Sequence, residues 1–199
     1  MQLDTDLTGL FGITLAIMTQ LVRVPRIQAF PPRQRAAVLG GAILLLSIPL
    51  WGVSLAGFVR SMTGDLSVPT LLLLMLSLVR VSSSRVLFEE QNRTAMLKAM
   101  LLIAILFYPF ALGISLFDPY RLGYGSLWLL LALLGLAVWS ALRYSTLLAL
   151  CIAAAVAAWS VDWYESTNLW DYLLDPWLAI YALVVLVKGQ WLRWRKIDA

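Results

Sequence analysis

Residues 127–142 read LWLLLALLGLAVWSAL, and after Arg143-Tyr144 residues 145–161 continue as STLLALCIAAAVAAWSV. Neither stretch contains a charged residue, and each is long enough to approach the thickness of a bilayer as a helix. Transmembrane β-strands would alternate apolar and polar residues, which these stretches do not. The sequence therefore predicts two membrane-spanning helices here, joined by a tight connection.

The composition extends this interpretation to the whole chain. It is 61% hydrophobic and only 13% charged, with a mean hydropathy of +0.85. Soluble domains are about half apolar and about a quarter charged. We predict an all-α integral membrane protein, a single polytopic bundle of seven transmembrane helices over residues 1–199. The spans are expected at residues 7–22, 36–59, 69–88, 93–116, 127–142, 145–161 and 176–192.

Three of these spans need comment. Residues 7–22 are short, so a re-entrant or interfacial segment is the alternative to a full crossing. The span 36–59 contains Pro49, where we expect a kink. The apolar part of the third span is only ten residues, Thr70–Val79. To cross, its helix must continue past Arg80 and Arg85 to about Glu90, and Asn92 is then expected to cap the next span.

The distribution of charge predicts the orientation. The segments 23–35, 80–98, 143–144 and the tail from 188 hold thirteen Lys and Arg and three acids. The remaining segments hold two Arg and eight acids. The positive-inside rule places the first set in the cytoplasm, with the N-terminus outside and the C-terminus inside. If residues 7–22 do not cross, only the N-terminus changes side.

The residue inventory limits the chemistry. The chain has no His and one Cys, Cys151, inside an apolar stretch. His ligation of haem or zinc, and a His general base, are thereby excluded. From the acidic start we expect no cleavable signal peptide, and the excess of Arg over Lys is compatible with a bacterium. We expect a multi-pass protein of the bacterial inner membrane without a metal or cofactor.

Two acidic dipeptides recur on the predicted outer side. Asp118-Pro119 and Asp175-Pro176 each stand at the start of a predicted helix or span. The mechanical explanation is that Asp caps the first free N–H groups while Pro fills the first helical position. The functional alternative is a pair of carboxylates held close together at an outer-face site.

Aromatic residues accompany the acids in the segment 162–175. Trp163, Trp170 and Trp177 are spaced by seven, so on a helix they would share one face. Asn168 and Asp171 resemble a capping box, which predicts a short helix over residues 169–174. We expect this segment to lie in the outer interface, either as an ordinary aromatic belt or as a docking surface for a partner protein or sugar. In the docking alternative, replacing Trp170 and Asp171 by Ala should leave folding intact.

The cytoplasmic arginines form the other candidate site. Arg80 and Arg85, joined by Arg23 and Arg26, are candidates for binding a lipid phosphate through the guanidinium fork. The simpler explanation is that they fix topology beside anionic headgroups.

Three functions remain open from the sequence. The first is a non-catalytic membrane subunit or accessory partner of a cell-envelope complex, because no catalytic motif is found and no Asp, Glu or Lys lies mid-span. The second is a transporter or scramblase for a lipid or lipid-linked substrate. The third is an enzyme whose outer carboxylates act as acid and base. These carboxylates are Asp118, Asp162, Glu165, Asp171 and Asp175. Expected partners are membrane lipids and a membrane protein or a second copy of the chain, with no nucleic acid.

Overall fold

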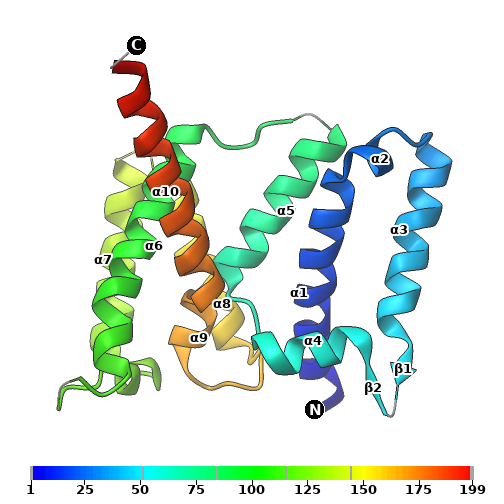
Figure 1. Ribbon diagram of the computed structural model, residues 1–199. Helices are drawn as coiled ribbons and strands as arrows, with labels where there is room; N and C mark the ends of the chain where they lie inside the picture. The colour runs from blue at the N-terminus through cyan, green and yellow to red at the C-terminus, as the bar shows by residue number, and fades with distance from the viewer. Residues whose placement is uncertain (1, 51, 84, 115, 144, 198–199) are drawn as a thin grey trace. The chain divides into compact units, whose positions relative to one another are not determined.

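Figure 1 shows the computed structural model of the chain, which describes residues 2–50, 52–83, 85–114, 116–143 and 145–197. The fold is all-α, with 79% of the structure helical. The chain divides into two compact units. Unit 1 comprises Met1–Leu66, Thr70–Leu87 and Asp162–Glu165, and unit 2 comprises Ser67–Pro69, Phe88–Val161 and Ser166–Ala199.

Unit 1 is built on three helices that alternate in direction. These are α1 (Gln2–Arg23), α3 (Pro32–Ser47) and α5 (Val68–Ser83), of which α5 belongs to unit 1 from Thr70 onward. A single helical turn, α2 (Pro25–Gln28), links the first two. The prolines at 25 and 32 each start a new helix, because a first-turn Pro has no N–H to lose.

The expected continuous helix over residues 36–59 is wrong. α3 ends at Ser47, and Pro49–Leu50 (β1) pairs with Val53–Ser54 (β2) in a two-residue antiparallel ladder. Gly52 turns the chain there with φ of +88°, a conformation that favours glycine. Ser54 then caps a new helix, α4 (Leu55–Thr63), by accepting from the Gly57 N–H at 3.1 Å.

The core of unit 1 gathers where α1, α4 and the start of α5 meet. Its buried side chains are Ile13, Leu15, Ala56, Leu66 and Leu71, with Leu10, Ala16, Ile17, Leu46, Leu74 and Leu78 packed around them. By contrast, α3 has no buried residue. It therefore presents most of its apolar surface away from the unit.

Among its described residues, unit 2 has four long helices and two short ones. Its elements are α6 (Glu90–Ala111), the 3-10 helix η1 (Pro119–Gly123), α7 (Leu127–Leu142), α8 (Thr146–Ser160), α9 (Leu169–Leu173) and α10 (Pro176–Ile197). α10 packs on α6, α6 on α8, and α8 on α7, while α9 and η1 pack together at one end. The buried residues of α8, including Cys151, face this core.

The predicted helix boundaries around residue 90 are also wrong. α5 ends at Ser83 instead of continuing to Glu90, and α6 begins at Glu90 with Glu89, not Asn92, at the N-cap. Serines compete for backbone hydrogen bonds and are weak helix formers, and Ser83 Oγ donates to the Val79 carbonyl. Ser84, which belongs to the same predicted continuation, lies outside the described residues.

The α6 helix stops at Ala111 rather than at residue 116. Gly113, with φ of +89°, closes it in a Schellman motif, in which the Ile114 N–H donates to the Pro109 carbonyl and the Gly113 N–H to Phe110. α7 covers the residues of its predicted span, and α8 does so within one residue at each end. Of the predicted connection Arg143-Tyr144, Tyr144 lies outside the described residues.

Helix length separates two candidate spans from the rest. Within the described residues, Glu90–Ala111 and the stretch Leu169–Arg195 are long and apolar enough to cross a membrane. Four apolar helices are shorter: Leu7–Arg23, Val68–Ser83, Leu127–Leu142 and Thr146–Ser160. A 16-residue helix is about 24 Å long, short of a hydrocarbon core of about 30 Å. The structure therefore supports membrane helices weakly and does not confirm a seven-span bundle.

Candidate functional site

The short helix expected after Asn168 exists as α9. The Asn168 Oδ1 atom accepts from the Trp170 N–H at 3.0 Å and so caps the helix. The reciprocal half of the predicted capping box is absent from the described contacts, because the Asn168 N–H donates to Ser166 Oγ and Asp171 turns to other partners.

Five residues around α9 form a hydrogen-bond network, which we call the α9 cluster: Tyr120, Ser166, Asn168, Trp170 and Asp171. The Asp171 Oδ2 atom accepts from the Tyr120 hydroxyl at 2.9 Å and from Ser166 Oγ at 2.5 Å. The Asn168 side-chain amide donates to the Tyr120 carbonyl at 2.9 Å. The cluster thus fastens α9 to η1 by hydrogen bonds between distant parts of the chain.

Trp170 anchors the same cluster from inside unit 2. Its indole N–H donates to the Pro119 carbonyl at 2.9 Å, and its ring centroid lies 4.5 Å from that of Phe107 on α6. Only 9% of Trp170 is exposed. A buried Trp whose ring packs against another aromatic ring and whose N–H donates a hydrogen bond is held in one orientation.

The environment of Tyr120 favours its neutral form. Burial, with a further contribution from the hydrogen bond to Asp171, raises the pKa of the Tyr120 phenol above its ordinary value. The neutral phenol is the form that can donate to the Asp171 carboxylate. Tyr120 therefore acts in this structure as a hydrogen-bond donor.

Asp118 and Asp175 perform the capping expected on the mechanical explanation. Asp118 Oδ1 accepts from the Tyr120 N–H at 2.9 Å at the start of η1. Asp175 Oδ1 accepts from the Leu178 N–H at 2.7 Å at the start of α10. Asp175 is buried, and its second oxygen accepts from both the N–H and the hydroxyl of Ser67. This carboxylate therefore ties residues 67–69 to α10.

The three tryptophans do not share a helical face, so that prediction is wrong. Trp163 lies in a non-helical segment of unit 1, Trp170 on α9 and Trp177 on α10. Their spacing of seven is interrupted by residues 161–168, which are not helical. Trp163 and Trp177 are 42% and 48% exposed, respectively, whereas Trp170 is buried. Trp163 and Trp177 therefore keep part of their rings at the surface, whereas Trp170 does not.

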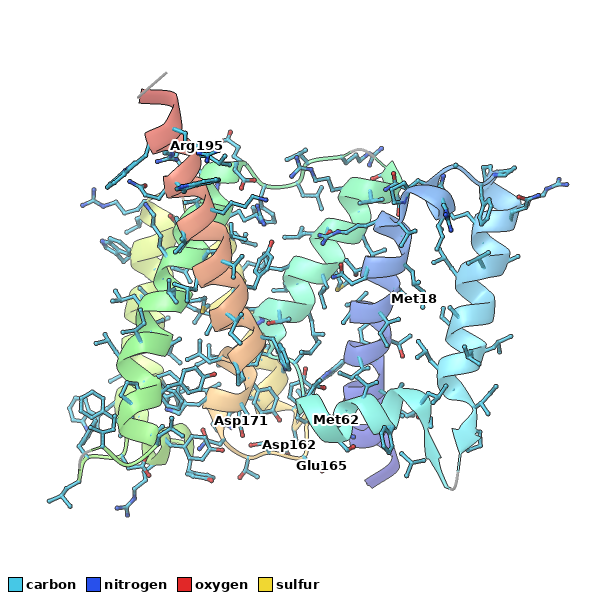
Figure 2. The ribbon with its side chains drawn as sticks, viewed as in Figure 1. Met18, Met62, Asp162, Glu165, Asp171 and Arg195 are labelled. Atoms are coloured by element: carbon cyan, nitrogen blue, oxygen red, sulfur yellow. The ribbon has the colours of Figure 1, made fainter. Side chains whose placement is uncertain are left out.

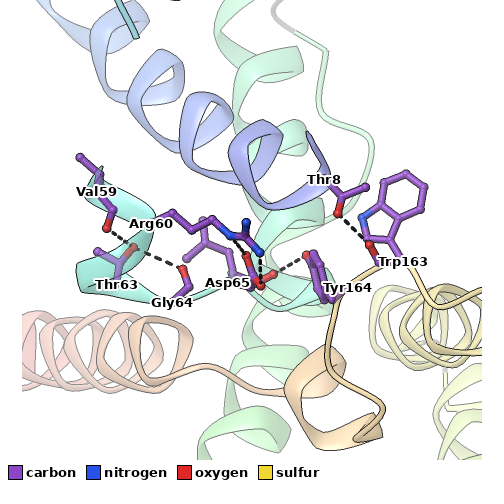
Figure 3. A network of polar contacts seen from close by, with 9 residues as sticks. Thr8, Val59, Arg60, Thr63, Gly64, Asp65, Trp163 and Tyr164 are labelled. Carbon is purple, nitrogen blue, oxygen red and sulfur yellow. Dashed lines mark hydrogen bonds and ion pairs between the residues drawn. The ribbon is translucent and has the colours of Figure 1, made fainter. Parts of the chain in front are cut away.

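A separate polar network holds the acidic end of unit 1 (Figure 3). Arg60 and Asp65 form a two-point ion pair, with N–O distances of 2.6 and 3.0 Å. Gly9 of α1 lies against this pair, and a Cβ there would stand 2.2 Å from the Arg60 Nε atom. The Tyr164 hydroxyl donates to the Leu66 carbonyl, and the Thr8 hydroxyl donates to that of Trp163. Residues 162–165 are thereby fixed to α1 and to Leu66, in the connection that follows α4.

The arginines predicted to bind phosphate lie on neighbouring elements of unit 1. Arg23 ends α1, Arg26 lies on α2 and Arg80 is in the last turn of α5, while Arg85 follows that helix. Arg23 Nη2 donates to Ser77 Oγ on α5 at 2.5 Å. All four arginine residues are exposed.

Each unit separates its charges between its two ends. In unit 1, α1 and α5 end and α3 begins at the arginine-bearing end, whereas Asp162 and Glu165 lie at the other (Figures 1 and 2). Asp65, which follows α4, lies near Tyr164 at that same end (Figure 3). In unit 2, Figure 2 shows Arg195 near the end of α10 and Asp171 at the opposite end. The residues placed here follow the charge asymmetry of the sequence within each unit, except Arg60, which lies at the acidic end of unit 1 and pairs with Asp65.

A polar contact between α6 and α10 was among those that the sequence did not predict. Arg93 on α6 donates to the Tyr181 hydroxyl on α10 and pairs with Glu90 at 2.7 Å, and its guanidinium lies 5.8 Å from the Tyr181 ring centroid. The spacing of Glu90 and Arg93 was a usable signal, since residues three apart face each other on a helix. The partner Tyr181 has no local signal, because it is 88 residues away.

Comparisons with known protein families, curated proteins and solved structures gave no significant match. Among the described residues, no group of three or more His, Cys, Asp or Glu side chains is placed to hold a metal ion.

Proposed function

We propose that the chain is a multi-pass protein of the bacterial inner membrane with seven crossings, its N-terminus outside and its C-terminus in the cytoplasm. The observation that carries this proposal is the charge separation within each unit. In both units the helices alternate in direction between an arginine-rich and an acid-bearing end. A bilayer with a positive-inside bias would select that arrangement.

The exposed surface supports the same placement. Large apolar side chains lie on the outside of helices in both units, such as Leu44 on α3 at 71% exposed and Trp128 on α7 at 79%. In water such surfaces are costly, whereas hydrocarbon accepts them. The 15- and 16-residue helices match the membrane if it thins locally and if flanking Arg side chains extend to the headgroups.

Single-cysteine labelling tests the topology directly. Cys151 is buried, so a Cys151→Ala background leaves the chain free of thiols. Cysteines placed at the exposed positions Gln28 and Glu89 should react only from the cytoplasmic side, and cysteines at Arg121 and Glu165 only from outside. Labelling of position 165 from the cytoplasmic side overturns the model.

Within the membrane we propose a non-catalytic role, as a subunit or accessory partner of a cell-envelope complex. In its support, the carboxylates of the α9 cluster and of Asp175 are engaged in holding helix ends together. The side chains that remain exposed on the acidic ends include Trp163, Glu165 and Trp177. Exposed aromatic rings beside acids suit a protein partner.

Purification in mild detergent tests this role. The non-catalytic role is supported if a partner co-purifies in stoichiometric amount. That partner should be lost when the exposed tryptophans are substituted but kept when the cytoplasmic arginines are. A chain that purifies alone and carries a tightly bound lipid supports the second candidate, a lipid or lipid-linked-substrate transporter or scramblase. That candidate draws on the exposed arginines of unit 1.

A further inference from the structure

The arginine-bearing end of unit 1 is organised by a contact between two helices. Arg23 Nη2 donates to Ser77 Oγ at 2.5 Å, which ties the end of α1 to the last turns of α5. Arg80 follows Ser77 by three residues, so it lies on the same face of α5, one turn nearer the helix end. The fold therefore brings Arg23 and Arg80 to one surface.

These positive charges have little compensation within unit 1. In the part of the chain that the structure describes, Arg26, Arg80 and Arg85 form no ion pair. The described carboxylates of the unit, Asp65, Asp162 and Glu165, lie at its other end. Like charges held together without a counter-charge repel one another, and a bound anion relieves that repulsion.

Exposed apolar side chains on the same segments favour an anion that also carries acyl chains. Val86 and Leu87, next to Arg85, are 63% and 59% exposed, and Met75 on α5 is 47% exposed. A ligand with both a phosphate and acyl chains would satisfy the guanidinium groups and cover these side chains. A free phosphate would satisfy only the arginines.

We propose that Arg23, Arg26, Arg80 and Arg85, the arginine end, bind the headgroup phosphate of an anionic phospholipid in the cytoplasmic leaflet. This inference rests on the membrane placement proposed above. The planar guanidinium donates two parallel hydrogen bonds to phosphate oxygens, which an ammonium does not. Because the hydrogen bond to Ser77 orients Arg23, its guanidinium is already in place before the lipid binds.

The test uses the full-length chain in detergent, with lipid binding measured by native mass spectrometry. Phosphatidylglycerol should bind, phosphatidylcholine should bind more weakly, and soluble glycerol phosphate should not compete. The double variant Arg26→Gln, Arg80→Gln should lower the affinity for phosphatidylglycerol about thirtyfold, since it removes two surface charges worth about 1 kcal/mol each. Because both residues are exposed, the melting temperature without lipid should not change.

The matched control removes two arginines from unit 2. Arg143→Gln with Arg193→Gln deletes the same charge from exposed positions and should leave the affinity unchanged. Equal losses in both double variants would overturn the inference, as would equal binding of phosphatidylcholine or competition by glycerol phosphate. A wild-type chain absent from the membrane fraction would instead overturn the proposed placement, so the two failures are distinguishable.

Discussion

Gly123 lies directly against the carboxamide of Asn168. A Cβ at position 123 would stand 1.7 Å from Asn168 Oδ1 and 2.8 Å from the Trp170 ring. η1 and α9 therefore approach as closely as they do only because residue 123 has no side chain. Asn168 has little freedom to withdraw, since its Oδ1 caps α9 and its Nδ2 binds the Tyr120 carbonyl.

Gly123→Ala should accordingly destabilise unit 2. The added methyl group forces η1 and α9 apart and breaks the cap, at a cost of about 1–3 kcal/mol. The measurement is the melting temperature in detergent. Gly135→Ala is the matched control, because a Cβ there meets nothing within 4 Å and Ala is the better helix former. A Gly123→Ala variant as stable as this control would contradict the close packing.

The Tyr120 phenol predicts a loss of stability in alkaline solution. Its pKa is raised in the folded protein, while the unfolded value is about 10. The folded state therefore holds its proton more tightly than the unfolded state above that pH. The contribution of Tyr120 is complete below about pH 10 and falls as the pH rises through the folded pKa. The difference in melting temperature between wild type and Tyr120→Phe should shrink from pH 8 to pH 11; a constant difference would contradict the assignment.

Trp170 provides a test of anchoring within the fold. Trp170→Ala should cost about 3–5 kcal/mol of stability, as removal of a buried Trp typically does. The structure thus reverses the expectation that Ala at positions 170 and 171 leaves folding intact. Thermal or denaturant unfolding of the purified variant measures the loss. A wild-type melting temperature would show that the ring is not part of the core.

Trp177 provides the complementary test of docking. It is 48% exposed, so Trp177→Ala should change the melting temperature little. If its ring anchors a partner, binding should weaken by about 1–3 kcal/mol, as truncated aromatic anchors do. Co-purification followed by a titration with the isolated partner measures this. Unaltered affinity would remove Trp177 from the docking surface.

The helical class and several helices could be predicted from apolar runs alone, because whether such a run forms a helix depends mainly on residues close by in the sequence. α7, α8 and the capped turn α9 are of this kind. The break of the predicted helix at residues 48–54 was harder, since Pro49 permits either a kink or an end. In the structure the helix ends before Pro49, and Gly52, with its positive φ, turns the chain into a hairpin.

The candidate sites were less accessible to sequence reasoning, because their contacts join distant residues. The capping explanation for Asp175, one of the two left open by the sequence, agrees with the structure, but the bonds of this carboxylate to Ser67 span 108 residues. Trp170 was assigned to an interface from its spacing, yet its neighbours are Phe107 and Pro119. Periodicity indicates a shared face only while one helix continues, and between Trp163 and Trp170 no helix continues.

Arg80→Lys separates a phosphate fork from simple charge at the arginine end. Lys keeps the positive charge and the long apolar stem, so topology and expression should remain at wild-type levels. It loses the pair of parallel donors that a guanidinium offers to phosphate oxygens. We therefore expect the affinity for phosphatidylglycerol to fall about threefold to tenfold, roughly the net contribution of one ordinary hydrogen bond. Native mass spectrometry of the full-length variant measures the affinity, and Arg193→Lys serves as the control at an exposed position of unit 2. If Arg80→Lys binds the lipid as tightly as wild type, Arg80 contributes charge alone and does not contact the phosphate as a fork.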